Sequence, residues 1–261
     1  MALQDDGKTD EAIDLIRDFK RSLCNIRVLD PACGSGNFLY VALEGMKRLE
    51  GEVAEALRGL GETQSDAFTV DPSQFLGIEL NPWAAQIAEL VLWIGYLQWH
   101  YRTFGKATPS QPVLRDFHNI ENRDALLVLE GKRRRIGEDG APVTRWDGET
   151  MKRHPATGEM VPDASKRLDV YDYDSAAQAS WPKADFIVGN PPFIGASRMR
   201  EALGDGYVET LWATYPKMPQ SADFIMFWWE KAALPARAGM VRRFGFITTN
   251  SLRQTFNRRM L

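Results

Sequence analysis

The sequence predicts an α/β fold with a doubly wound, mostly parallel sheet, and three observations support this. Short apolar runs of strand length alternate with long segments of helical periodicity. A glycine-rich turn joins the first such run to the helix that follows it. Unusual polar residues stand at the ends of the predicted strands: Asp30, Glu79, Asp124 and Asn190. Because parallel strands place their carboxyl ends at one edge, where ligands bind in such sheets, we expect these four residues there.

Each element is predicted from its own pattern. Helical spacing of apolar residues predicts helices within 10–22, 38–60, 83–104 and 222–236, and Pro82 suits the start of the third. In the second helix the apolar residues are Leu39, Val41, Leu43, Met46 and Leu49. Strands are predicted at 26–29, 75–78, 184–188 and 244–248, with a further short strand and a turn within 119–129. Crossovers between such strands are expected to be right-handed.

The stretch 131–183 differs from its apolar flanks. It is polar and contains turn dipeptides at Asp139-Gly140, Asp147-Gly148 and Thr157-Gly158. A structureless loop of that length is unusual in a compact domain, so we expect a small β-hairpin insertion, with disorder as the alternative. The run Lys132-Arg133-Arg134-Arg135 at its start is interpreted either as a solvated loop or as a contact to phosphate.

Composition narrows the class of protein. The formal net charge of −3 does not fit an isolated basic nucleic-acid-binding module, so any such affinity should come from local patches or another domain. Two cysteines without metal-ligand spacing predict neither a zinc site nor a disulfide framework, and no metal site is expected. The polar N-terminus does not resemble a signal peptide, so a cytoplasmic location is the expectation. Polar residues within 83–104 favour a buried helix over a membrane span.

The glycine-rich turn reads Asp30-Pro31-Ala32-Cys33-Gly34-Ser35-Gly36-Asn37-Phe38-Leu39. Gly34 and Gly36 allow a tight turn and a close approach of the backbone to a ligand. The turn matches neither a dinucleotide fingerprint nor a P-loop, which makes a pyrophosphate a poor ligand. A ligand with a zwitterionic amino-acid tail suits it better, because Asp30 can attract a cation while helix N-terminal amides meet a carboxylate. A simple strand-to-helix turn is the alternative.

Glu79 follows the next predicted strand and can accept both hydroxyl groups of a ribose, as acids at this place do in dinucleotide folds. Alone it could be a solvated acid at a strand end. Together with the glycine turn it indicates an adenosyl group as ligand.

The segment Asn190-Pro191-Pro192-Phe193 follows the fourth predicted strand. An exocyclic amine on a base is a weak nucleophile, so a catalyst must hold it with acceptors. The Asn190 side-chain oxygen and the Pro191 carbonyl can accept its two protons, and the prolines keep that carbonyl rigid. Phe193 can stack on a base flipped out of a duplex. A Pro-Pro turn that merely ends a strand is the alternative.

These segments together resemble the γ group of amino-DNA methyltransferases. Asp30 to Leu39 is similar to motif I, Asp124 stands at the motif III position, and Asn190 to Phe193 is similar to catalytic motif IV. Ser221-Ala222-Asp223-Phe224 and 245–251 resemble motifs V and VI, and 194–200 is similar to large single-chain type II restriction-modification enzymes. The resemblance implies a class I, Rossmann-like fold, S-adenosylmethionine as cofactor, and methylation of adenine N6 in double-stranded DNA with the adenine flipped out. It implies cofactor contacts from these residues: Asp30, Pro31, Ala32, Cys33, Gly34, Gly36, Phe38, Glu79, Leu80, Asp124 and Ala125.

The resemblance divides the chain into an N-terminal helix (1–23), a cofactor-binding half (24–130), the polar insertion (131–183) and a catalytic half (184–261). No match to the family's upstream motif X precedes Asp30, and no strand is predicted after the fifth strand, 244–248. We therefore expect an incomplete methyltransferase core, with a target-recognition domain or specificity subunit supplied elsewhere. Two other interpretations remain: a silent fragment that binds cofactor or a partner, and an enzyme for another planar amine, namely cytosine N4, guanine N2 in ribosomal RNA, or protein glutamine.

Overall fold

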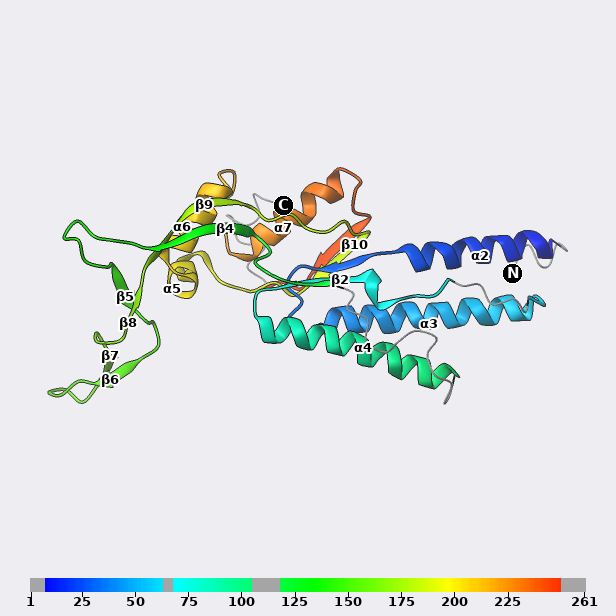
Figure 1. Cartoon of the computed structure of the whole chain (residues 1–261), viewed down its shortest axis with the longest axis horizontal. Helices are drawn as coiled ribbons and strands as arrows, with labels where there is room; N and C mark the ends of the chain where they lie inside the picture. Colours follow the sequence, from blue (N-terminus) through cyan, green and yellow to red (C-terminus); the bar gives the residue numbers. More distant parts are fainter. Residues whose placement is uncertain (1–7, 63–67, 105–117, 250–261) are drawn as a thin grey trace. The chain divides into compact units, whose positions relative to one another are not determined.

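The computed structural model describes residues 8–62, 68–104 and 118–249, which fall into two compact units (Figure 1). Unit 1 comprises Met1–Ala125, Trp181–Pro191 and Lys231–Ile247. Unit 2 comprises Leu126–Ser180, Pro192–Glu230 and Thr248–Leu261.

Unit 1 contains a parallel sheet that, in the described residues, has five strands in the order β11-β10-β1-β2-β3. The strands are β1 (Val28–Asp30), β2 (Phe75–Glu79), β3 (Ile120–Asn122), β10 (Phe186–Gly189) and β11 (Arg243–Phe246). All four neighbouring pairs are parallel. The predicted α/β fold with a mostly parallel sheet is therefore confirmed.

The fourth strand lies later in the sequence than predicted. The amides of Asp185 and Phe186 both donate to the Arg27 carbonyl, at 2.9 and 3.1 Å, and the Asp185 carboxylate accepts from the Arg27 amide. These contacts fix the start of pairing with β1 at Phe186. On its other side β10 pairs with β11, as far as Gly189 opposite Phe246.

Three helices of unit 1 lie side by side in Figure 1: α2 (Thr9–Asn25), α3 (Asn37–Gly59) and α4 (Pro82–Phe104). α3 connects β1 to β2 and α4 connects β2 to β3, so right-handed crossovers place both on the same face of the sheet. A short 3-10 turn, Pro72–Gln74, precedes β2. The crossover from β10 to β11 contains α7 (Ile225–Arg237), which passes from unit 2 into unit 1.

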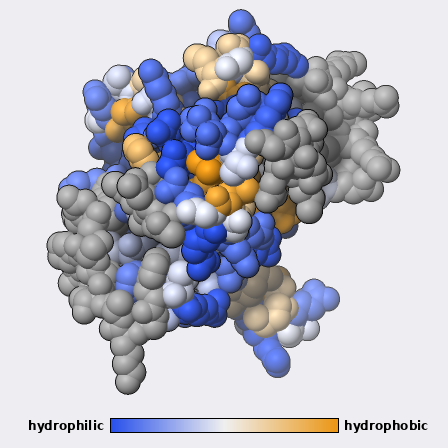
Figure 2. All heavy atoms as spheres, turned by 90° about the vertical axis from the view of Figure 1, so that its right-hand side faces the viewer, coloured by the Kyte–Doolittle hydropathy of each residue, from blue (hydrophilic) through white to orange (hydrophobic). Residues whose placement is uncertain are grey.

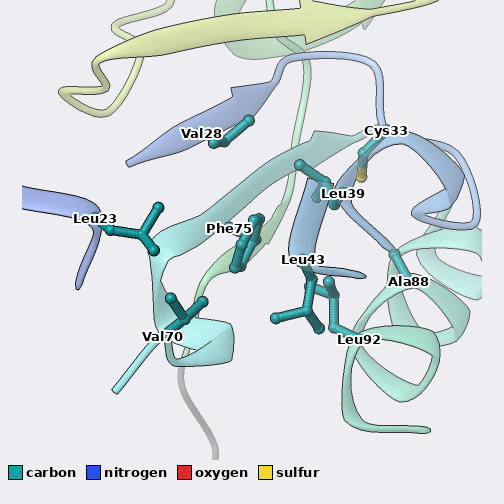
Figure 3. Close-up of a cluster of buried hydrophobic side chains, with 9 residues drawn as sticks. All are labelled: Leu23, Val28, Cys33, Leu39, Leu43, Val70, Phe75, Ala88 and Leu92. Carbon is teal, nitrogen blue, oxygen red and sulfur yellow. The ribbon is translucent and has the colours of Figure 1, made fainter. Parts of the chain in front are cut away.

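The hydrophobic core of unit 1 lies between β1, β2 and the helices α3 and α4. Phe75 is fully buried on β2, and Figure 3 shows Leu39, Leu43 and Leu92 from the two helices on one side of it and Leu23 and Val70 on the other. Ala88 of α4 belongs to the same cluster, and its small side chain lets α4 pack closely against the other residues of the cluster. This packing fixes where α3 and α4 begin relative to the strand ends that precede them.

One face of α4 is buried and the other exposes apolar residues. Trp83 is 75% exposed and Leu90 57%, whereas Ala88 and Leu92 are buried. The prediction of a buried helix was thus wrong for the outer face. In the described part of the chain, no helix is long and apolar enough to cross a membrane. On the side of the molecule where the N-terminus lies, the described surface is mainly hydrophilic, with a small hydrophobic group near its centre (Figure 2).

The sheet order places a topological switch point between β1 and β10. The chain proceeds outward from β1 through β2 to β3 and then returns to β10 on the other side of β1. Ligands of open α/β sheets bind beyond the carboxyl ends of the strands at such a point. Asp30 and Gly189 end the two strands that meet there.

The polar stretch in unit 2 forms nested antiparallel strand pairs that, in the described residues, do not pair with the sheet of unit 1. The pairs are β4 (Leu127–Arg134) with β9 (Tyr171–Gln178), β5 (Thr144–Trp146) with β8 (Arg167–Asp169), and β6 (Met151–Arg153) with β7 (Met160–Pro162). The ladder begins at Leu127, upstream of the polar stretch, and is longer than a small hairpin. Its glycines in the predicted turns have positive φ: Gly140, Gly148 and Gly158.

Most of the basic run at the start of this stretch lies on a strand, so its interpretation as a loop was wrong, although Lys132 to Arg134 are exposed to solvent as expected. Lys132, Arg133 and Arg134 lie on β4, and Arg135 follows directly. Their partners are acids of β9, β8 and α6 or, for Lys132, an aromatic ring. The pairs are Arg133–Asp174 at 3.0 Å, Arg134–Asp169 at 2.9 Å, Arg135–Asp172 and Arg135–Glu209 at 2.6 Å, and Lys132 at 4.1 Å from the Tyr171 ring centre. Local acids therefore offset much of this charge.

Two helices that the sequence pattern did not predict follow the 3-10 turn Ala196–Arg198: α5 (Met199–Leu203) and α6 (Asp205–Thr214). α6 packs against β9 at Gly206, where an added Cβ atom would lie 1.6 Å from the Tyr171 carbonyl oxygen. The absence of a side chain at Gly206 allows this contact.

We predict that Gly206→Ala lowers the free energy of unfolding by at least about 1–3 kcal/mol, because α6 must move away from β9 to avoid the overlap. Urea unfolding followed by tryptophan fluorescence measures this. The control is Gly51→Ala within α3, where an added Cβ meets nothing within 4 Å and should stabilise by about 0.5–1 kcal/mol. Equal stabilities of the two variants would contradict the described contact.

Candidate active site

Asp30 ends β1 and has a buried carboxyl group, with the residue only 1% exposed. Its Oδ1 atom accepts a hydrogen bond from the Ala32 amide at 3.0 Å, while Oδ2 is buried and has no partner among the described groups. Burial raises the pKa of Asp30 to about 7; the Ala32 amide opposes the rise and the charge of Glu79 adds to it. The site thus holds a buried acceptor that a cation or a donor could satisfy.

Glu79 ends β2 and joins the glycine turn to the start of α4. Its Oε2 atom accepts from the Gly34 amide at 2.9 Å, and its Oε1 atom accepts from the Asn81 amide at 2.8 Å. The Cys33 amide donates to the Ile78 carbonyl at 3.1 Å and brings the turn to the end of β2. A carboxylate has about four acceptor positions, so Glu79 keeps capacity for further donors.

The two glycines of the turn serve different purposes. Gly34 has φ +53°, and an added Cβ there would meet nothing within 4 Å, so its open side is available for a ligand. Gly36 has φ +83°, and an added Cβ would lie 3.0 Å from the Ala88 Cα atom. Close approach to a ligand was the expected reason for both glycines. At Gly36 the close neighbour is instead α4, and at Gly34 the approach of a ligand stays a prediction.

Cys33 is buried and packs against β2, where a Cβ at Gly77 would lie 2.7 Å from its sulfur. Burial raises the pKa of the Cys33 thiol far above its usual range, and the charges of Asp30 and Glu79 raise it further. A thiolate is the nucleophilic form of cysteine, so this environment disfavours nucleophilic chemistry at Cys33.

Gly189 brings the end of β10 against Asp30. An added Cβ at Gly189 would lie 2.5 Å from the Asp30 Oδ1 atom. The Gly189 carbonyl accepts from the Ile247 amide at 3.0 Å, which holds this strand end from the other side. The next residue, Asn190, is exposed, and Pro191 after it is buried. The buried acid and Asn190 are therefore neighbours at the switch point.

The segment that contains Asp124 follows β3 and lies at the same edge of the sheet. The Asn122 side-chain amide donates to the carbonyls of Glu79 and Leu80, at 2.8 and 3.0 Å, and the Arg123 amide donates to the Glu79 carbonyl. Asp124 is half-buried and follows this contact directly. Leu80 itself is 68% exposed.

The remaining predicted residues have different places. Pro31 is buried, and Ala32 and Phe38 are half-buried in the turn and in the first turn of α3. Ala125 is buried, and its carbonyl accepts from the Trp181 indole at 2.7 Å. Pro192 and Phe193 belong to unit 2, so the structure does not group them with Asp30 and Glu79; Phe193 is 42% exposed.

Four residues that position the site were not singled out from the sequence: Gly77, Asn81, Asn122 and Gly189. Asn81 could have been found as a helix cap before Pro82, since its Oδ1 atom accepts from the Trp83 amide at 3.0 Å. Gly77 and Gly189 could have been found as strand glycines, which often mark a close approach. Among the described residues, no group of three or more His, Cys, Asp or Glu side chains could hold a metal ion.

Comparisons with known proteins find DNA methyltransferases and restriction-modification enzymes. The model of a family described as MmeI, DNA-methyltransferase domain, matches residues 4–261. DNA methyltransferase A of Bacillus subtilis (strain 168) is 25% identical over 229 residues, which are 88% of this chain and 21% of that protein. A putative type II restriction enzyme and methyltransferase of Methanocaldococcus jannaschii is 30% identical over 96 residues, 37% of this chain and 8% of that protein.

A solved structure of the type IIL restriction-modification enzyme MmeI in complex with DNA matches with a TM-score of 0.60 and 26% identity. The match covers 92% of this chain and 26% of that chain. This chain therefore spans only about a fifth to a quarter of these two long relatives.

We predict that Asp30→Asn changes how stability depends on pH. The pKa of Asp30 lies above its ordinary value of 3.8, so the folded protein binds this proton more tightly than the unfolded chain. Protonation of Asp30 therefore adds up to about 4 kcal/mol to the free energy of unfolding below about pH 4, and this contribution is lost as the pH rises to about 7. Urea unfolding at several pH values across this window should show wild type losing stability relative to Asp30→Asn. A pH-independent difference would contradict the raised pKa.

Proposed function

Since the chain belongs to the MmeI DNA-methyltransferase domain family, we propose that it transfers the methyl group of S-adenosylmethionine to adenine N6 in DNA. The observation that carries this proposal is the cluster of Asp30, Gly34 and Glu79 at the switch point, with Asn190 next to Gly189 beside it. On the same basis we propose that the α/β fold is the class I, Rossmann-like methyltransferase fold.

The residues present fit this cofactor. The unpartnered Oδ2 atom of Asp30 suits the ammonium group of an amino-acid tail, and a cation there would also favour the ionised carboxyl group. The open side of Gly34 leaves room for the ligand beside the turn. Glu79 can accept ribose hydroxyls with its remaining lone pairs, and exposed Leu80 offers an apolar surface for adenine. When bound, S-adenosylmethionine supplies an electrophilic methyl group.

Pro31, Ala32, Cys33 and Phe38 would support this pocket as parts of the turn. Gly36 would do so by its close contact with α4. Asp124 and Ala125 follow β3 and would approach the cofactor adenine from beside Glu79, because Asn122 and Arg123 hold that segment against the end of β2.

The catalytic step requires positioning of a weakly nucleophilic amine. The Asn190 side-chain oxygen and the Pro191 carbonyl would accept hydrogen bonds from the two N–H groups of that amine and orient its lone pair toward the methyl group. The new N–C bond would form as the bond from the methyl group to sulfur breaks, and the methylated amine would then lose one proton to solvent. Pro192 stiffens the segment, and Phe193 stacks on the extruded base. Such orientation can supply about 7–11 kcal/mol of barrier lowering, so no covalent enzyme intermediate is needed. Cys33, buried and with a raised pKa, takes no part as a nucleophile.

The proposed partner is double-stranded DNA with one adenine flipped out. The related MmeI structure with DNA supports this choice of partner. Recognition of a particular sequence would come from a target-recognition domain or specificity subunit outside the residues discussed, because the basic run on β4 is paired with local acids.

We predict that Asp30→Asn and Glu79→Gln each weaken S-adenosylmethionine binding by about 1.5–3 kcal/mol, the usual contribution of a hydrogen bond to a charged group. Isothermal titration calorimetry measures this. Glu55→Gln, which changes an exposed acid on α3, is the control and should bind like wild type. Wild-type affinity in both site variants would remove the cofactor assignment.

We also predict that Asn190→Ala, made in an intact methyltransferase that contains this chain, abolishes methylation while cofactor affinity stays within about a factor of three, because Asn190 acts on the reacting base. The assay is transfer of tritiated methyl groups to unmethylated genomic DNA, with RNA and protein as alternative substrates. Digestion of the product should yield N6-methyladenine. Label in N4-methylcytosine, RNA or protein would replace the proposed substrate, and retained transfer by Asn190→Ala would refute the catalytic assignment.

A further inference from the structure

The chain that follows Phe193 is held by a second segment of unit 2, residues 221–224. The Phe224 amide donates to the Ile194 carbonyl at 2.9 Å. The Asp223 Oδ1 atom accepts from the Ala196 amide at 3.1 Å. Two hydrogen bonds therefore fix the backbone within three residues of the aromatic side chain that we expect to stack on the base.

The segment that makes these contacts is itself well anchored. Ala222 is fully buried and Phe224 is 3% exposed. The Phe224 ring packs edge-on against the Trp228 ring, with 4.8 Å between the centroids. The Asp223 carbonyl accepts from the Met226 amide at 2.9 Å at the start of α7. Asp223 thus holds the loop from a rigid position rather than from a mobile side chain on the surface.

Asp223 also provides what the local sequence lacks. Ala196 begins a 3-10 turn whose preceding residue, Gly195, has no side chain to accept the first amide. The Asp223 carboxylate takes that place from a distant part of the chain, and an added Cβ at Gly195 would lie 3.7 Å from its Oδ1 atom. A charged acceptor on a backbone amide forms one of the stronger types of hydrogen bond.

We propose that Asp223 is a positioning residue for methyl transfer, which rests on the function proposed above: it fixes the backbone from Ile194 to Ala196 and thereby sets the place of Phe193. In this proposal Asp223 acts through the loop and not by contact with cofactor or base. Substitution of Asp223 should therefore change turnover and the protection of the loop amides from hydrogen exchange, and should leave cofactor affinity unchanged.

The test combines hydrogen exchange with kinetics on an intact methyltransferase that contains this chain. In Asp223→Ala the Ala196 amide should exchange about ten-fold faster or more, because its acceptor is gone. Methyl transfer to DNA should fall roughly a hundred-fold, the loss expected from a misplacement of about 1 Å. Cofactor affinity by calorimetry should stay unchanged. In Asp223→Asn the side-chain oxygen remains as an acceptor, so protection and turnover should largely return.

The control is Asp174→Ala, which removes an exposed carboxylate of the same unit and should leave loop exchange and turnover as in wild type. Unchanged exchange at Ala196 in Asp223→Ala would refute the loop contact. Faster exchange with full turnover would refute the positioning role, and so would a loss of turnover that Asp223→Asn does not restore. If wild type transfers no methyl group to DNA, the proposed function fails together with the catalytic part of this proposal, while the exchange data still decide whether Asp223 fixes the loop.

Discussion

The buried carboxyl group of Asp30 is the constraint on which the site depends. It lies where the strand order reverses, and one of its oxygens is held by the Ala32 amide while the other is unpartnered in the described structure. Because this carboxyl group occupies the space beside β10, residue 189 must lack a side chain, and Asn190 follows directly. The residue expected to meet a cofactor and the residue expected to meet the target base are thus set by the same contact.

Glu79 extends this arrangement along the sheet edge. Its two oxygens hold Gly34 on one side and Asn81 on the other, and its carbonyl receives the Asn122 side chain and the Arg123 amide. Backbone amides, rather than other side chains, therefore position the acids. A site built in this way is defined before any ligand arrives, which limits the ordering cost on binding.

Part of this edge was predictable because β1 and β2 end at acids, Asp30 and Glu79. Features that arise from pairing distant segments could not be predicted. Lys47 is fully buried in α3, where it donates to Glu50 and Thr69 at 3.0 Å, while Val41, expected on the apolar face, is 63% exposed. The charge balance between β4 and β9 and the role of Asp223 toward Ala196 likewise depend on contacts that local periodicity does not contain.

The central claim is that Asp30 meets the cationic tail of the cofactor, and proton release on binding tests it most directly. Near pH 6 the carboxyl group, with a pKa of about 7, is mostly protonated, and a bound cation should ionise it. Calorimetric titration with S-adenosylmethionine in buffers of different ionisation enthalpy counts these protons. We expect wild type to release close to one proton near pH 6 and Asp30→Asn to release none. Tight binding by wild type without proton release would contradict it.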